Sequence, residues 1–265
     1  MKQRADIACV EAGLAQSREK AQAMIMAGQI YIGEKKIEKS SEPVDDIGQL
    51  HIHGQTDAFA SRGGHKLEKA ITTFRADVNG CVCMDIGAAT GGFTDVLLRH
   101  GAQHVYSIDV GYGQLDWKLR NDSRVVNLER TNLRYVTEEQ IPEKLDIAVC
   151  DVSFISLKLV MPAVAPLLKP DAEIMCLIKP QFEAGRELVG KKGVVRDKKV
   201  HEAVIRDILS FMPTIGFSVT GIDYSPITGP EGNIEFLLYM HNSSAPSLEP
   251  DITSLVESAH RELKS

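Results

Sequence analysis

The sequence predicts an α/β protein whose main part is a doubly wound, Rossmann-like sheet of seven strands, preceded by a small α/β domain. From residue 65 onward, short apolar runs alternate with amphipathic stretches of helical period, as expected for a parallel sheet with helices on both faces. The last two runs have no helix between them, so they should form a hairpin with one antiparallel strand. A glycine-containing connection at 59–64 separates the two parts.

The size and composition of the chain allow this two-domain organisation. The 265 residues are 43% hydrophobic and 25% charged, which is typical of a globular protein. No run approaches the roughly 18 apolar residues of a membrane span, and the N-terminal residues lack the apolar centre of a signal peptide. We therefore expect a cytoplasmic protein without a membrane partner.

The five cysteines predict neither disulfides nor a metal site. They are odd in number and have no paired metal-ligand spacing, and four of them fall in apolar, strand-like runs. We expect buried thiols and no bound metal.

The first domain, residues 1–58, should begin with a helix over residues 5–12 and a second helix that starts at Ser17, a good N-cap, and ends at Gly28. Strands are expected at residues 29–33, 35–39 and 49–53, with a turn at Pro43. The stretch SREKAQAMIMAGQIYIGEKKIEK resembles the alpha-L RNA-binding domain of ribosomal proteins and pseudouridine synthases. The resemblance implies that RNA meets a face made by the following residues: Arg4, Ser17, Arg18, Lys20, Lys35 and Lys36.

Charge leaves an alternative open for this domain. Residues 1–58 hold seven lysines and arginines against nine acidic residues, and the whole chain has a net charge of −6. RNA binders are usually basic, although phosphate contacts need only a local cationic face. The domain could instead dock onto another protein surface.

The second domain, residues 65–242, should contain strands at 81–86, 104–110, 124–128, 144–150, 172–179, 217–225 and 233–240. A seven-stranded sheet with one reversed strand near its end is the architecture of S-adenosylmethionine-dependent methyltransferases. Residues 243–265 should form a polar linker and a terminal helix, with Ile252, Leu255, Val256 and Leu263 on one face.

A glycine-rich turn after the first strand of this domain is the candidate cofactor site. Glycines let the backbone approach a ligand, and the following helix offers unpaired N–H groups and the positive end of its dipole. The dinucleotide pattern G-x-G-x-x-G is not matched, which disfavours NAD. Asp109 and Glu129 end the next two strands, where they could bind the ribose and face the adenine of S-adenosylmethionine. The proposed cofactor-binding residues are Asp85, Gly87, Ala88, Gly91, Gly92, Phe93, Asp109 and Glu129.

Four charged residues form the candidate catalytic set. Lys66 lies in the helix before the first strand, Asp151 follows the fourth strand, Lys179 ends the fifth, and Glu235 lies in the last. Carboxyl ends of neighbouring parallel strands converge on one crevice, so Asp151 and Lys179 are plausible neighbours. The positions of Lys66 and Glu235 need a further argument.

A resemblance to a known family supplies that argument. Seven segments, in order along nearly the whole chain, resemble the TlyA/hemolysin A family of rRNA methyltransferases: SRGGHKLEKA, DIGAATGGFTD, DVGYGQLDWKLR, ERTNLR, CDVSFISL, LIKPQFEAGRELVGKKGVVRD and SPITGPEGNIEFL. The family's catalytic domain is similar to FtsJ-type ribose 2′-O-methyltransferases with a Lys-Asp-Lys-Glu tetrad, which corresponds to Lys66, Asp151, Lys179 and Glu235 here. The resemblance implies methylation of a ribose, expected to be that of a cytidine, in 16S and/or 23S ribosomal RNA.

The chemistry suits these residue types. A ribose hydroxyl must lose its proton as it attacks the sulfonium methyl, and Lys179 is our candidate to accept or steer that proton. A lysine is normally protonated at neutral pH. A nearby Lys66 ammonium would favour the neutral amine, whereas Asp151 and Glu235 would favour the charged one, and the sequence leaves that balance open.

Three other functions remain as alternatives. A cytolysin would need membrane-spanning helices or amphipathic hairpins, which the sequence lacks. A base-nitrogen methyltransferase commonly carries a D/N-P-P-Y/F motif after the fourth strand, where this chain has Asp151-Val152-Ser153-Phe154. A ribosome-assembly factor could bind RNA and keep only the fold.

Overall fold

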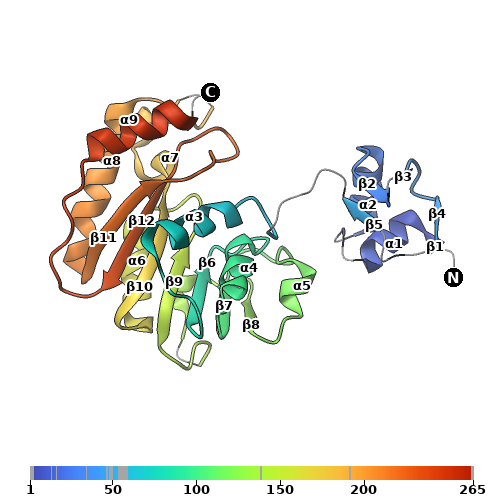
Figure 1. Ribbon diagram of the computed structural model, residues 1–265, viewed down its shortest axis with the longest axis horizontal. Helices are drawn as coiled ribbons and strands as arrows, with labels where there is room; N and C mark the ends of the chain where they lie inside the picture. Colours follow the sequence, from blue (N-terminus) through green and yellow to red (C-terminus); the bar gives the residue numbers. More distant parts are fainter. Residues whose placement is uncertain are drawn as a thin grey trace. The chain divides into compact units, whose positions relative to one another are not determined.

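The computed structural model describes residues 3–12, 14–15, 17–33, 35–45, 47, 50–52, 59–137, 139–190 and 192–263. The chain divides into two compact units, Met1–Ala58 and Phe59–Ser265 (Figure 1).

The first unit combines two helices with short strands. Helix α1 (Ala5–Glu11) contacts α2 (Arg18–Met26), whose N-cap Ser17 accepts a hydrogen bond from the Lys20 amide, as the sequence predicts. The strands are β1 (Gln3–Arg4), β2 (Ile30–Ile32), β3 (Lys35–Lys36), β4 (Pro43–Val44) and β5 (Leu50–Ile52). Strands β3, β2 and β5 form an antiparallel sheet in that order.

The prediction of a turn at Pro43 is wrong. Pro43 begins β4, which pairs with β1 so that Pro43 lies opposite Arg4. A proline lacks the N–H donor, and a two-residue strand paired on one side does not need every donor. Apolar side chains fill the core under these elements, among them Ala5, Ala8 and Cys9 on α1 and Ile25 on α2.

The second unit is built on a seven-stranded sheet within the described residues. Its strands are β6 (Val82–Ile86), β7 (His104–Ile108), β8 (Val125–Leu128), β9 (Leu145–Cys150), β10 (Leu168–Ile178), β11 (Phe217–Tyr224) and β12 (Phe236–Asn242). They lie in the order β11-β12-β10-β9-β6-β7-β8 (Figure 1). Strand β12 runs antiparallel to both neighbours and the other pairs are parallel, so the predicted hairpin and reversed strand are confirmed.

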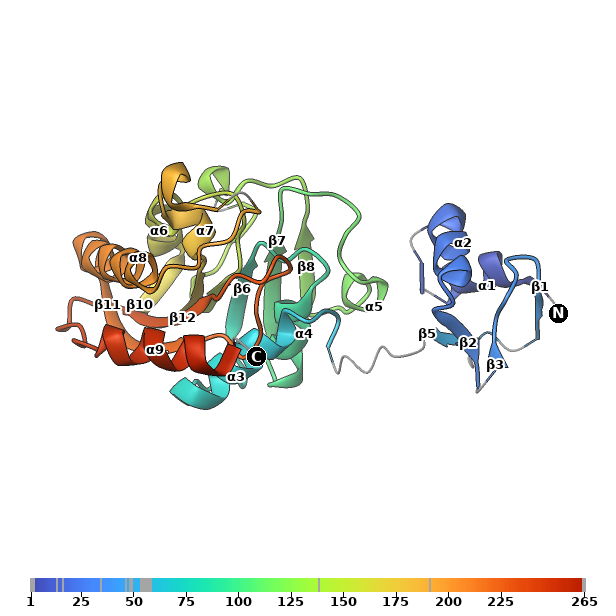
Figure 2. The same cartoon turned by 90° about the horizontal axis from the view of Figure 1, so that it is seen from above.

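Helices cover both faces of this sheet. Helices α3 (Gly64–Phe74) and α4 (Gly92–Arg99) lie on one face, and α6 (Leu157–Val164) and α8 (Lys198–Phe211) on the other (Figure 2). Each face buries its own apolar cluster. The short helices α5 (Trp117–Arg120) and α7 (Pro180–Glu183) follow β7 and β10.

The C-terminal helix α9 (Ile252–Leu263) packs on the second unit. Its Ile252 and Val256 are buried in the same cluster as α8, and Leu255 and Leu263 pack against that cluster, so all four share the predicted face. The helix therefore contributes to the core of the second unit.

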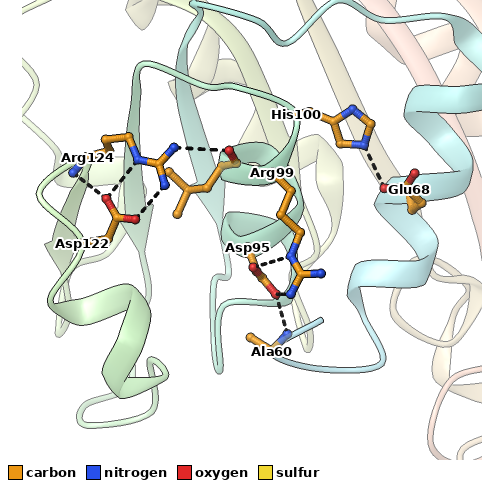
Figure 3. A network of polar contacts seen from close by, with 8 residues as sticks. Ala60, Glu68, Asp95, Arg99, His100, Asp122 and Arg124 are labelled. Atoms are coloured by element: carbon orange, nitrogen blue, oxygen red, sulfur yellow. Dashed lines mark hydrogen bonds and ion pairs between the residues drawn. The ribbon is translucent and has the colours of Figure 1, made fainter. Parts of the chain in front are cut away.

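The segment before α3 also belongs to this unit. Phe59 and Ala60 pack against the cluster under α4, and the Ala60 amide donates to Asp95 Oδ2 at 2.8 Å. Asp95 also pairs with Arg99 one turn later, and His100 bonds Glu68 of α3 at 2.8 Å (Figure 3). Ala60 thus fastens the connection expected at 59–64 to α4, and His100 joins the end of α4 to α3.

Cys9, Cys83, Cys150 and Cys176 are buried thiols, as expected, and Cys81 is partly exposed. No helix among the described residues is long and apolar enough to cross a membrane. The described residues also contain no group of three or more His, Cys, Asp or Glu side chains that could hold a metal ion.

Candidate active site

A cavity of about 570 Å³ lies at the carboxyl ends of β6, β9 and β10. All four members of the candidate catalytic set line it, together with Asp85, Gly87, Ala88, Gly92 and Phe93 of the glycine-rich turn. This is the edge of a parallel sheet where ligands commonly bind in doubly wound folds.

The four catalytic candidates form one continuous series of ion pairs. Lys66 Nζ lies 2.6 Å from Glu235 Oε2 and 3.7 Å from Asp151 Oδ2. Asp151 Oδ1 lies 2.5 Å from Lys179 Nζ. Asp151 therefore stands between the two lysines, and the side chains of Lys66, Lys179 and Glu235 are less than a tenth exposed.

Strand register explains how Glu235 reaches this set. Ile178 at the end of β10 pairs with Phe236 at the start of the antiparallel β12. The residues beyond that pair, Lys179 and Glu235, therefore leave the sheet at the same edge. Lys66 comes from the first turn of α3. The reversal of β12 is what brings a residue from the last strand to this edge.

The glycine-rich turn is packed tightly against the catalytic residues. Gly87 has φ +82°, and a Cβ there would lie 2.7 Å from the backbone oxygen of Asp151. A Cβ on Gly92 would meet the Ser61 hydroxyl, and one on Gly91 would meet Leu119. Only glycine fits these three close approaches without displacing a neighbour.

Asp85 is completely buried at the end of β6. Its Oδ2 accepts hydrogen bonds from the amide and hydroxyl of Thr94 at 2.9 and 2.7 Å, which anchors the first turn of α4. Burial raises the pKa of the Asp85 carboxyl to about 7, against the opposing effect of the Thr94 hydrogen bonds. Its Oδ1 has no hydrogen-bond partner in the described part of the chain.

Comparison with known proteins agrees with this arrangement. Residues 59–242 match the family described as FtsJ-like methyltransferase, and residues 3–49 match the S4 domain. The chain belongs to the FtsJ-like methyltransferase family.

Full-length relatives support the assignment. The chain is 48% identical to YqxC of Bacillus subtilis strain 168, provisionally named an rRNA methyltransferase, over 99% of this chain and 96% of that protein. It is 42% identical to the 16S/23S rRNA (cytidine-2′-O)-methyltransferase TlyA of Mycobacterium tuberculosis, over 97% and 96%. A solved structure from Streptococcus thermophilus, provisionally named a hemolysin, has a TM-score of 0.78 at 43% identity, over 99% and 97%.

Three expected cofactor residues, Gly91, Asp109 and Glu129, lie outside the lining of the cavity in the FtsJ-like domain. Asp109 accepts from the amides of Ala89 and Gly111 at 2.8 and 2.6 Å, so it fixes the glycine-rich turn. Glu129 lies 2.5 Å from Arg120 Nη2, and this hydrogen bond lowers the pKa of Glu129. Both side chains therefore already have protein partners.

Three further residues line this cavity without a role predicted from the sequence: Ser153, Phe154 and Phe182. Lys179 Nζ donates to Ser153 Oγ at 3.0 Å. Phe154 is 90% exposed with φ +65°, and its ring lies 4.9 Å from that of Phe182. The position of Ser153 two residues after Asp151 was the available signal, but spacing alone does not show where a loop side chain points.

In the S4 domain, the candidate RNA-binding residues differ in their surroundings. Arg4 and Arg18 both bond Asp6, and Lys35 pairs with Glu42 at 2.6 Å. Ser17 caps α2, whereas Lys20 and Lys36 are exposed.

Proposed function

We propose that this protein is an S-adenosylmethionine-dependent methyltransferase that methylates the ribose 2′-hydroxyl of a cytidine in 16S and/or 23S ribosomal RNA. The observation that carries the proposal is the series Glu235, Lys66, Asp151, Lys179 along the wall of a cavity that the glycine-rich turn also lines. The cytidine is suggested by the name of the M. tuberculosis relative.

Three features fit S-adenosylmethionine as the methyl donor. Gly91, the N-cap of α4, has no capping side chain, so the first amides of the helix suit the methionine carboxylate. The buried Asp85 Oδ1 is an acceptor suited to the methionine ammonium. Each Asp109 oxygen accepts one amide and keeps a second acceptor position for a ribose hydroxyl. When bound, S-adenosylmethionine supplies an electrophilic sulfonium methyl group.

The chain's own residues then handle the target hydroxyl. We assign to Lys179 the contact with the 2′-hydroxyl, because its Nζ is held by Asp151 and Ser153 at the cavity wall. It orients the hydroxyl oxygen and, as the neutral amine, takes up its proton while the oxygen–methyl bond forms, which leaves an ammonium group paired with Asp151. Lys66, which Glu235 holds, contacts Asp151 from the other side. Most of the rate gain should come from holding the hydroxyl in line with the methyl group.

The S4 domain serves as the substrate reader in this proposal. Arg4, Arg18, Lys20 and Lys36 present half-exposed or exposed cations to the phosphates of ribosomal RNA. A ribosomal RNA substrate is consistent with the cytoplasmic location that the sequence predicts.

Tritium transfer from labelled S-adenosylmethionine to purified ribosomal subunits tests the function. We expect label in one or both subunits, and nuclease digestion should release it as 2′-O-methylcytidine. The labelled position should resist alkaline cleavage, because a methylated 2′-oxygen cannot attack the adjacent phosphate.

The other outcomes separate the alternatives. Alkali-sensitive label would move the target from the ribose to a base. Subunit binding without any label would favour an assembly factor that has kept only the fold.

A further inference from the structure

The S4 domain contains a buried carboxylate that the proposed reaction does not use. Asp6 on α1 has no exposed surface. Its Oδ1 accepts from Arg4 Nε at 3.0 Å, and its Oδ2 accepts from Arg4 Nη2, Arg18 Nη2 and Gln22 Nε2 at 3.0, 3.0 and 2.9 Å. Burying a charge is costly unless it is paired and hydrogen-bonded, and Asp6 is both.

The donors come from two separate segments. Arg4 lies in β1 directly before α1, and Arg18 and Gln22 lie one turn apart on α2. Packing of α1 against α2 brings the two segments together, and Asp6 then fixes both guanidinium groups at one place. The hydrogen bond from Arg4 holds the pKa of the Asp6 carboxyl well below its usual range, so the carboxylate stays charged.

The two arginines keep most of their capacity to bind another anion. Their side chains are 45% and 53% exposed, although each contacts a buried group. A guanidinium group has five N–H donors. Arg4 uses two of them in its bonds to Asp6, and Arg18 uses one. The remaining donors are those a phosphate diester would accept from.

We infer that Asp6 is a positioning residue for RNA: it holds Arg4 and Arg18 side by side, so that both guanidinium groups meet neighbouring phosphates of the ribosomal RNA backbone. The inference rests on the proposed function, because it assumes that these arginines contact RNA. The inference assigns a role in phosphate binding to an acidic residue, although the negative charge of Asp6 by itself would repel a phosphate.

The charge of Asp6 and its positioning role predict opposite effects of Asp6→Asn on RNA binding, and this difference can be measured on the full chain. Asp6→Asn makes the domain more positive, so a purely electrostatic role predicts tighter RNA binding. Positioning predicts the opposite, because the amide accepts fewer hydrogen bonds and its NH₂ group faces the arginine donors. We expect the KM for ribosomal subunits to rise at least tenfold while kcat at saturation stays within twofold. The salt dependence of binding should become shallower as phosphate contacts are lost.

Glu11→Gln is the matched charge control. Glu11 lies on the same helix, is exposed, and bonds only Gln3 among the described residues. This variant should leave the KM within twofold of wild type. A KM for Asp6→Asn that is unchanged or lower, as for the control, would overturn the inference.

The arginine variants separate positioning from a general loss of structure. Arg4→Ala with Arg18→Ala should raise the KM, and adding Asp6→Asn to that pair should change it by less than twofold. A further large rise would mean that Asp6 acts through something else. If the arginine pair alone leaves the KM unchanged, the proposed RNA face itself is wrong.

Gln22→Met provides a second test of the inference in case Asp6→Asn fails to fold. It removes one hydrogen bond to Asp6 without changing any charge, and Gln22 is only partly buried. We expect a two- to fivefold rise in KM with the thermal unfolding midpoint nearly unchanged. An unchanged KM for this folded variant would contradict the inference.

Discussion

At the scale of single residues, Asp151 organises the candidate active site. One carboxylate oxygen faces Lys179 and the other faces Lys66, so a single side chain sets the separation of the two amines. The two lysines then have different partners, because Glu235 contacts Lys66 and Ser153 contacts Lys179. This asymmetry is the reason to assign the proton-accepting role to Lys179.

Lys179→Ala should therefore abolish turnover while S-adenosylmethionine affinity and RNA affinity stay near wild type, because the lost interaction belongs to the transition state. Lys179→Arg should fail as well, since a guanidinium keeps its proton and its planar fork does not replace a compact amine. Tritium transfer measures turnover, and calorimetry measures cofactor affinity.

The control for this prediction is Lys158→Ala. Lys158 forms a more exposed ion pair with Asp207 on the surface of the same unit. Such pairs contribute about 0–1 kcal/mol, so this variant should keep nearly full activity. Substantial turnover by Lys179→Ala would remove the assigned role.

At the scale of elements, the turn between β6 and α4 must stay narrow for the catalytic residues to keep their places. The closest approach is that of Gly87 to the backbone of Asp151. The turn is thus part of the wall that sets where Asp151 lies, in addition to its proposed role toward the methyl donor.

Gly87→Ala should lower kcat/KM at least tenfold, because the added Cβ would lie 2.7 Å from the Asp151 oxygen and displace it. Gly216→Ala is a matched control with a similar φ of +87° and no atom within 4 Å of the added Cβ. Each variant should lose about 1–2 kcal/mol of stability from its left-handed backbone. Steady-state kinetics and thermal unfolding check both. Equal activities would show that the approach to Asp151 does not matter.

At the scale of the whole molecule, the division of labour between the two units is testable by removing one. The second unit has its own sheet, with apolar clusters on both faces. Phe59 and Ala60 belong to that unit, because the Phe59 side chain packs against the apolar cluster under α4. The Ala60 amide also donates to Asp95 Oδ2 (Figure 3).

A chain shortened to begin at Phe59 should bind S-adenosylmethionine with an affinity within about threefold of the full chain. It should methylate ribosomal subunits at least tenfold more slowly at low subunit concentration, because the phosphate contacts proposed for the S4 domain are gone. Calorimetry and tritium transfer measure the two properties. A chain that begins at Ser61 is the comparison, and it should unfold at a lower temperature. Full-rate methylation by the Phe59 form would mean that the S4 domain is not the substrate reader.

The sequence alone determined the features that are encoded over a few consecutive residues. Alternation of apolar runs and helical stretches predicted the seven-stranded sheet, and the absence of a helix before the last run predicted the reversed β12. Ser17 was recognisable as a helix N-cap because capping depends on residues three positions apart. Resemblance to known motifs, more than local pattern, selected the candidate catalytic residues.

Only the tertiary structure decided which side chains meet. Lys66 and Glu235 are 169 residues apart in the chain and come together because antiparallel β12 starts where β10 ends. Donors within reach then compete for each carboxylate: Asp109 binds two backbone amides, Glu129 binds Arg120, and Asp6 binds two arginines. Such partnerships depend on register and on the direction of side chains from distant segments. A local sequence pattern does not contain that information, because it exists only once the chain has folded.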